Sequence, residues 1–75
     1  MQTEFTCGIY RATPLGNQWG ISVNQYTLAT VSMDGKTIKF ADLPVHLSVN
    51  DLIEIAVLMN NIKRQYKQHA NTTNP

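Results

Sequence analysis

Hydrophobic and polar residues alternate with a period of two in the first half of the chain, which is typical of β-strands that bury one face. The buried face of the first such segment, residues 4–12, is expected to hold Phe5, Cys7 and Ile9. Tyr10 then falls on the opposite, open face. Residues 13–17 contain a proline and a glycine, which suit a chain reversal, so a turn is predicted after the first strand.

Two further segments have strand character. Residues 18–23 place Trp19 on the face that we expect to be buried, and residues 26–33 are rich in β-branched side chains. In the second segment we favour an inward orientation for Val31 and Met33. Asn24-Gln25 between them is either a tight turn or part of one long strand.

The dipeptide Asp34-Gly35 is the strongest local turn signal in the chain, because it suits the two positive φ values of a type I′ hairpin turn. The strand that follows it is expected to bury Ile38 and Phe40 and to expose Lys39.

The hydrophobic period changes to that of a helix after residue 47. Ser48 is placed to act as the N-cap, and Asp51 is placed to return its hydrogen bond, as in a capping box with aspartate instead of glutamate. One stripe at helical spacing is expected to pack on the sheet, and it consists of Leu52, Ile55, Met59, Ile62 and Tyr66.

These segments predict an α+β fold. It consists of a three- to four-stranded antiparallel β-sheet of hairpins, followed by one long C-terminal α-helix packed on one face. Residues 1–70 are expected to form a single domain, and residues 71–75 a flexible polar tail.

Composition excludes several classes of protein. Of 75 residues, 43% are hydrophobic and 15% are charged, and the formal net charge is +1. Such a weak field argues against a strongly basic nucleic-acid binder and against an acidic nucleic-acid mimic. We see no signal peptide and no apolar run long enough to span a bilayer, so we expect a cytoplasmic protein without a membrane partner.

The helix has more hydrophobic residues than one stripe requires. Ile53, Val57 and Leu58 point partly away from the stripe. Either the loop of residues 43–47 covers them, or the helix packs on a second copy of the chain or on another protein. We favour the intermolecular alternative, because exposed apolar patches usually mark interaction sites. The predicted interface consists of Ile53, Val57, Leu58, Asn60 and Asn61 on the helix, and Tyr10 on the open sheet face.

Cations gather near the end of the helix. Lys63, Arg64 and Lys67 are candidates for phosphate contacts, and Tyr66 is a candidate for stacking on a base. The simpler interpretation is that these cations complement the negative end of the helix dipole. Nucleic acid is therefore the alternative partner.

No set of residues indicates catalysis. Cys7 shares the phase of buried residues, which is usual for an inert thiol, and His46 lies in a connection where a solvated histidine is the ordinary case. Each carboxylate has an ordinary structural position, which is a strand edge, a turn, a loop, a helix cap or the helix surface. Because the spacing of a zinc site is absent, we expect no metal. Because no residues are left over for an active site, we expect no cofactor, small-molecule substrate or enzymatic activity.

The sequence thus favours a small non-enzymatic protein-protein interaction module. We expect it to form a homodimer through its helix and to regulate or inhibit a larger macromolecular partner. In size and neutrality the chain is similar in type to the small accessory proteins of bacteria and phages that block or modulate a larger protein.

Overall fold

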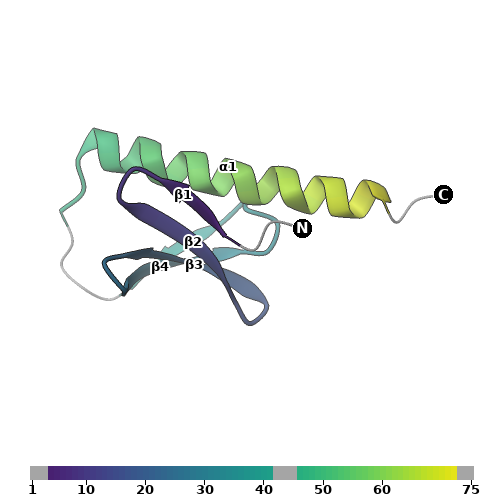
Figure 1. Cartoon of the computed structure of the whole chain (residues 1–75), viewed down its shortest axis with the longest axis horizontal. Coiled ribbons are helices and arrows are strands. Elements are labelled where there is room, and N and C mark those ends of the chain that lie inside the picture. The colour runs from purple at the N-terminus through teal and green to yellow at the C-terminus, as the bar shows by residue number, and fades with distance from the viewer. Residues whose placement is uncertain (1–3, 42–45, 73–75) are drawn as a thin grey trace.

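A computed structural model describes residues 4–41 and 46–72 of the chain. In these residues five strands precede one long helix. In chain order the elements are β1 (Phe5–Cys7), β2 (Tyr10–Leu15), β3 (Gln18–Val23), β4 (Tyr26–Ser32), β5 (Ile38–Phe40) and α1 (Val49–Thr72). Each strand pairs antiparallel with the next, so the sheet is a meander in the order β1-β2-β3-β4-β5, and α1 lies along one face (Figure 1). The predicted α+β class is confirmed, with five strands instead of three or four.

The segment 4–12 forms two strands rather than the single strand that its alternation predicts. Gly8 has a φ of 61°, a left-handed conformation that glycine adopts without strain, and the chain reverses there. Cys7 of β1 therefore pairs with Tyr10 of β2. Because the reversal breaks the alternation, Ile9 is 66% exposed in the turn while Tyr10 is only 4% exposed. The prediction that Tyr10 lies on the open sheet face is wrong for this reason.

The turns on either side of β4 differ in type. Asn24 and Gln25 have φ values of 49° and 68°, so they form the tight turn between β3 and β4 and not part of one long strand. In Asp34-Gly35 only the glycine has a positive φ, 74°, and its N–H donates to the Ser32 carbonyl at 2.9 Å. The predicted type I′ turn is therefore wrong. The Asp34 carboxylate instead accepts hydrogen bonds from the Ser32 hydroxyl and the Lys36 N–H, which stabilises a longer loop.

The hydrophobic core lies between the sheet and the helix. A register shift between β3 and β4 leaves Leu28 without an opposing residue, and this bulge turns both Leu28 and Ala29 toward the core. Trp19 is buried as predicted, whereas Met33 lies in the loop after β4 and is exposed. The buried residues are Tyr10, Ala12, Trp19, Ile21, Leu28, Ala29, Val31, Ile55, Leu58 and Ile62.

The start of α1 has the predicted capping box. The Ser48 N–H donates to Asp51 Oδ2 at 2.9 Å, and the Asp51 N–H donates to Ser48 Oγ at 3.1 Å. The helix continues to Thr72, past the point where the polar tail was expected to begin. Residues 73–75 of that predicted tail lie outside the described residues.

The helix presents a different stripe to the sheet from the one that the sequence predicts. Leu58 is fully buried between Ile55 and Ile62, while Leu52 and Tyr66 are about half-exposed. The helix is thus rotated toward β1 and β2, the strands on which it packs. The prediction that Leu58 faces away from the sheet is wrong, because the side of the helix that carries Leu58 is the side that these two strands cover.

Two loops fix this rotation by close approach to α1. A Cβ atom on Gly8 would overlap the Glu54 carboxylate, so the β1–β2 turn lies directly against the helix. On the other flank, a Cβ on Gly35 would lie 2.7 Å from both the backbone nitrogen of Lys63 and the carbonyl oxygen of Met59. Glycine is therefore required at Gly35 both by its positive φ and by the nearby helix backbone.

Candidate functional site

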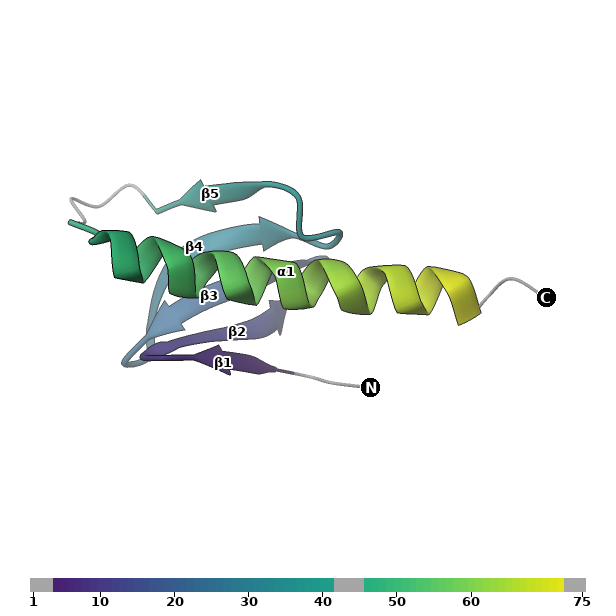
Figure 2. The same ribbon diagram turned by 90° about the horizontal axis from the view of Figure 1, so that it is seen from above.

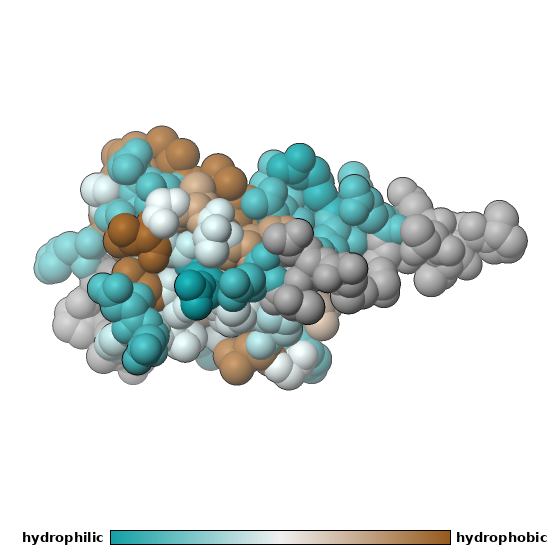
Figure 3. All heavy atoms as spheres, viewed as in Figure 1, coloured by the Kyte–Doolittle hydropathy of each residue, from teal (hydrophilic) through white to brown (hydrophobic). Residues whose placement is uncertain are grey.

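The first half of α1 exposes a set of large hydrophobic side chains on the side that faces away from the sheet. We call this set the apolar helix face, and it consists of Val49, Leu52, Ile53 and Val57. Ile53, near its centre, is 56% exposed, and the neighbouring Ala56 is exposed as well. Figure 3 shows hydrophobic side chains over this half of the helix and hydrophilic ones over the next part.

The β1–β2 turn exposes a further large hydrophobic side chain, that of Ile9. Ile9 follows Gly8, which lies against the Glu54 side chain of the helix, so the exposed Ile9 belongs to a turn that approaches the same half of α1. The sequence did not indicate Ile9, because simple alternation placed it in the core. The left-handed preference of Gly8 is the signal from which this turn could have been found.

The structure divides the predicted interface residues into two groups. Ile53, Val57 and Asn60 are exposed on α1, and Asn61 is half-buried and accepts a hydrogen bond from Arg64 Nη2 at 2.9 Å. Leu58 and Tyr10 are buried within the chain, with 0% and 4% exposure. These two residues therefore belong to the core, and the prediction that they form part of a surface interface is wrong.

The first half of α1 carries two acidic residues, Asp51 and Glu54, and both act on Tyr10 of β2. The hydrogen bonds from the Ser48 N–H and hydroxyl hold the pKa of Asp51 below its ordinary value, and a hydrogen bond from the Tyr10 side chain acts in the same direction. For Tyr10, burial is the largest cause of a raised pKa, and the hydrogen bond to Asp51 and the charges of Asp51 and Glu54 add to it. Asp51 and Glu54 thus both act on the pKa of the buried Tyr10 of β2.

The basic residues of the nucleic-acid alternative lie at the other end of the helix. Lys63, Arg64, Tyr66 and Lys67 are all exposed, and the last turns of α1 extend past the end of the sheet (Figures 1 and 2). The open sheet face lies on the side of the sheet away from the helix. The cations and that face therefore do not form one continuous surface.

The two residues weighed for catalysis lie in different parts of the fold, Cys7 in β1 and His46 in the segment before α1. Cys7 is half-buried against the core, and His46 is exposed before the helix. Within residues 4–41 and 46–72, no group of three or more histidine, cysteine or acidic side chains is arranged to hold a metal ion. In the same part of the chain, no helix is long and apolar enough to cross a membrane.

Comparison of the chain with protein-family models, curated proteins and solved structures finds no significant match. The candidate site is therefore defined by the geometry and chemistry of its own residues.

Proposed function

We propose that this chain is a small non-enzymatic interaction module that forms a homodimer through the apolar helix face and acts by binding a larger macromolecular partner. The observation that carries the proposal is the exposure of four large hydrophobic side chains on one side of α1, opposite the side that packs on the sheet. Fully burying one such side chain contributes about 1.5 to 3 kcal/mol. Their exposure in the single chain favours association.

The spacing of the apolar helix face supports a second copy of the chain as the partner. In a two-fold antiparallel helix pair, positions equidistant from the axis meet each other. With Ile53 at the axis, Val49 of one copy faces Val57 of the other, so hydrophobic side chains meet along the contact. The residues in contact are uncharged, and the low net charge of +1 adds little repulsion between copies.

The size of this face predicts a weak dimer. Val49–Val57 spans about 12 Å of helix, whereas a standard interface buries about 800 Å² on each partner. The contribution of Ile9 enlarges the contact only modestly. We therefore expect dissociation in the micromolar range or above, which leaves the same face available to another protein.

Sedimentation equilibrium across the micromolar range tests this proposal. The wild-type chain is expected to show a concentration-dependent mass between that of monomer and dimer, and Ile53→Lys is expected to remain monomeric. Gln68→Lys is the matched control, because it adds the same charge at an exposed position of the same helix outside the apolar helix face. A wild-type chain that stays monomeric, or equal association of Ile53→Lys and the control, would contradict the proposal.

A nucleic-acid-binding protein is the second candidate, and the protruding basic end of α1 favours it. Lys63 and Lys67 are exposed one helical turn apart, where both side chains can reach successive phosphates. This function predicts that a labelled single-stranded oligonucleotide binds with an affinity that falls as salt rises, and that replacing both lysines by glutamine abolishes binding. Binding that survives this replacement would argue against the candidate.

A further inference from the structure

The outer edge of β5 presents backbone groups that no strand of the described chain pairs with. In its ladder with β4, the Ala41 N–H donates to the Leu28 carbonyl at 2.9 Å and the Ser32 N–H donates to the Thr37 carbonyl at 2.9 Å. Hydrogen-bonded pairs alternate along an antiparallel ladder, so Lys39 also directs its backbone groups toward β4. The N–H and C=O groups of Ile38 and Phe40 therefore point away from the sheet.

The helix-facing side of this edge is only partly covered. The helix packs on β1 and β2, at the opposite end of the sheet, and seen from above β5 lies clear of it (Figure 2). Phe40 projects toward the helix side yet remains 40% exposed, and Ile38 is half-buried. The expectation that both residues are core positions thus holds only in part, because the helix is displaced toward the other edge. A further strand beside β5 would extend the hydrophobic layer here.

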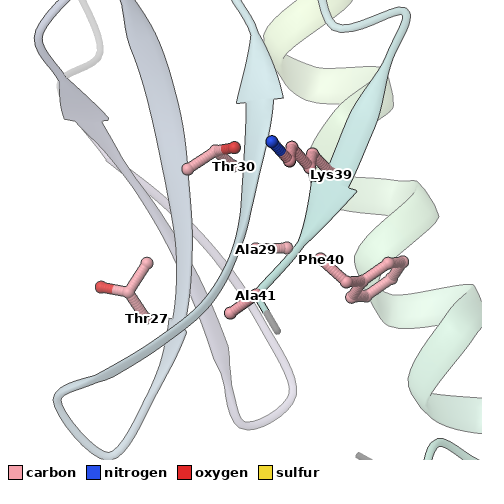
Figure 4. Close-up of a pocket in the computed structure, with 6 residues that line it drawn as sticks. All are labelled: Thr27, Ala29, Thr30, Lys39, Phe40 and Ala41. Atoms are coloured by element: carbon pink, nitrogen blue, oxygen red, sulfur yellow. The ribbon is translucent and has the colours of Figure 1, made fainter. Parts of the chain in front are cut away.

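Polar and apolar residues of β4 and β5 and the residue after β5 line an open hollow of about 560 Å³ at this edge (Figure 4). Its lining residues are Thr27, Ala29, Thr30, Lys39, Phe40 and Ala41. Thr30 and Lys39 are opposite each other in the ladder, and their side chains approach each other in the hollow. Within the described residues the one ion pair joins Glu4 and Arg11, so the ammonium group of Lys39 has no acidic partner there.

The positive charge of Lys39 determines which kind of strand can pair with the outer edge of β5. If β5 of a second copy paired antiparallel about Lys39, the two lysines would lie directly opposite each other, and like charges in that position are destabilising. Lysine on an edge strand is a common defence against such self-pairing. A strand with an acidic residue opposite Lys39 would instead place its carboxylate within reach of the ammonium group, on the side of β5 away from Thr30.

We propose that β5 accepts an extended segment of another protein as a sixth, antiparallel strand, with an acidic side chain opposite Lys39 and apolar side chains opposite Ile38 and Phe40. The four backbone groups that point away from β4 supply the hydrogen bonds of this β-augmentation, and Lys39 supplies its selectivity. The site is on a different element from the apolar helix face and does not depend on dimer formation.

Backbone-amide NMR titration with capped synthetic peptides tests this proposal. The probe is a seven-residue peptide with a central glutamate between two valines and flanking threonines, and the matched control carries lysine at the centre. The glutamate peptide is expected to shift the amides of Ile38 and Phe40 most and to bind about threefold to tenfold more tightly than the control. In Lys39→Glu this preference is expected to reverse.

A second pair of variants tests the backbone contribution. Phe40→Pro removes an outward N–H without breaking the ladder to β4, so it is expected to abolish binding. Phe40→Ala keeps that N–H and loses only the apolar contact, so it is expected to weaken binding without abolishing it. Absence of shifts at β5, equal binding of the two peptides, or strongest shifts elsewhere would overturn the proposal. Concentration-dependent shifts of β5 without peptide would overturn it in favour of a second copy. Should Phe40→Pro fail to fold, the peptide preference of Lys39→Glu tests the proposal without it.

Discussion

Gln25 occupies a conformation that its side chain disfavours. Its φ of 68° lies in the left-handed region, where a residue with a Cβ atom loses about 1–2 kcal/mol relative to glycine. Asn24 tolerates the same region better, because its short polar side chain can hydrogen-bond locally. The β3–β4 turn therefore contains one residue that suits a type I′ turn and one that does not.

We predict that Gln25→Gly stabilises the fold. The free energy of unfolding is expected to rise by about 0.5–1 kcal/mol, since relief of the left-handed strain exceeds the added entropy of the unfolded chain. Gln18→Gly in β3 is the control and is expected to lower the free energy of unfolding by about 0.5–1 kcal/mol. Urea denaturation measures both, and destabilisation by Gln25→Gly would contradict the argument.

Asp51 links stability to pH. Its pKa is lower in the folded chain than its ordinary value of 3.8, because Ser48 donates to it from both the backbone and the side chain. A lowered carboxyl pKa stabilises the fold above the ordinary value, and this contribution is lost as the pH falls through the folded pKa. Asp34, whose pKa is lowered by the hydrogen bond from Ser32, acts in the same direction.

We predict that stability falls on acidification below roughly pH 4, and that Asp51→Asn makes this fall shallower. The midpoint of urea unfolding at a series of pH values measures the effect. In Ser48→Ala the carboxyl-carbon NMR titration of Asp51 is expected to move back toward the ordinary value, because one of its donors is lost. An unchanged titration in that variant would show that the Ser48 hydroxyl is not a cause of the shift.

The orientation of α1 depends on which side of a nearly all-apolar helix the sheet covers. Leu58 is fully buried while its neighbour Val57 is exposed, so adjacent positions have opposite roles. Removal of a buried leucine side chain leaves a cavity and costs about 2–5 kcal/mol. A surface substitution changes stability by about 0.5 kcal/mol or less.

We predict that Leu58→Ala destabilises the chain by about 2–5 kcal/mol, and that Val57→Ala changes its stability by about 0.5 kcal/mol or less when measured in dilute solution. Thermal and urea denaturation, carried out at a protein concentration too low for association, measure the stability of both variants. Equal costs at both positions would mean that α1 is rotated away from the orientation described.

Most of the elements could be predicted from the sequence, although residues 4–12 were predicted as one strand and not two, and the faces of the elements could be predicted only in part. Alternation identified the strand segments, and Ser48 with Asp51 identified the start of the helix. Alternation failed at Gly8, because a tight turn resets the phase of the residues that follow. The helix stripe was misplaced because hydrophobic residues occur almost all round its first half, so several stripes fit equally well. The packing of the helix on β1 and β2 determines which stripe is buried, and this long-range contact cannot be predicted from the local sequence pattern.

At the scale of the whole molecule, one helix on one sheet leaves two surfaces open. The described chain measures 46 × 23 × 19 Å, and the end of α1 accounts for its elongation (Figure 1). The apolar helix face is suited to a second copy, and the β5 edge is suited to an extended acidic segment. Neither surface could be fully predicted from the sequence, because each depends on how far the helix is displaced toward β1 and β2.

Disulfide cross-linking at position 53 tests the central claim most directly. In a Cys7→Ser background, Ile53→Cys places one thiol at the two-fold axis of the proposed antiparallel helix pair, where it meets its counterpart within disulfide range. We predict that mild oxidation converts this variant to covalent dimers at micromolar concentration, while Gln68→Cys in the same background stays largely monomeric. Equal cross-linking at both positions, or none at position 53, would contradict self-association through the apolar helix face.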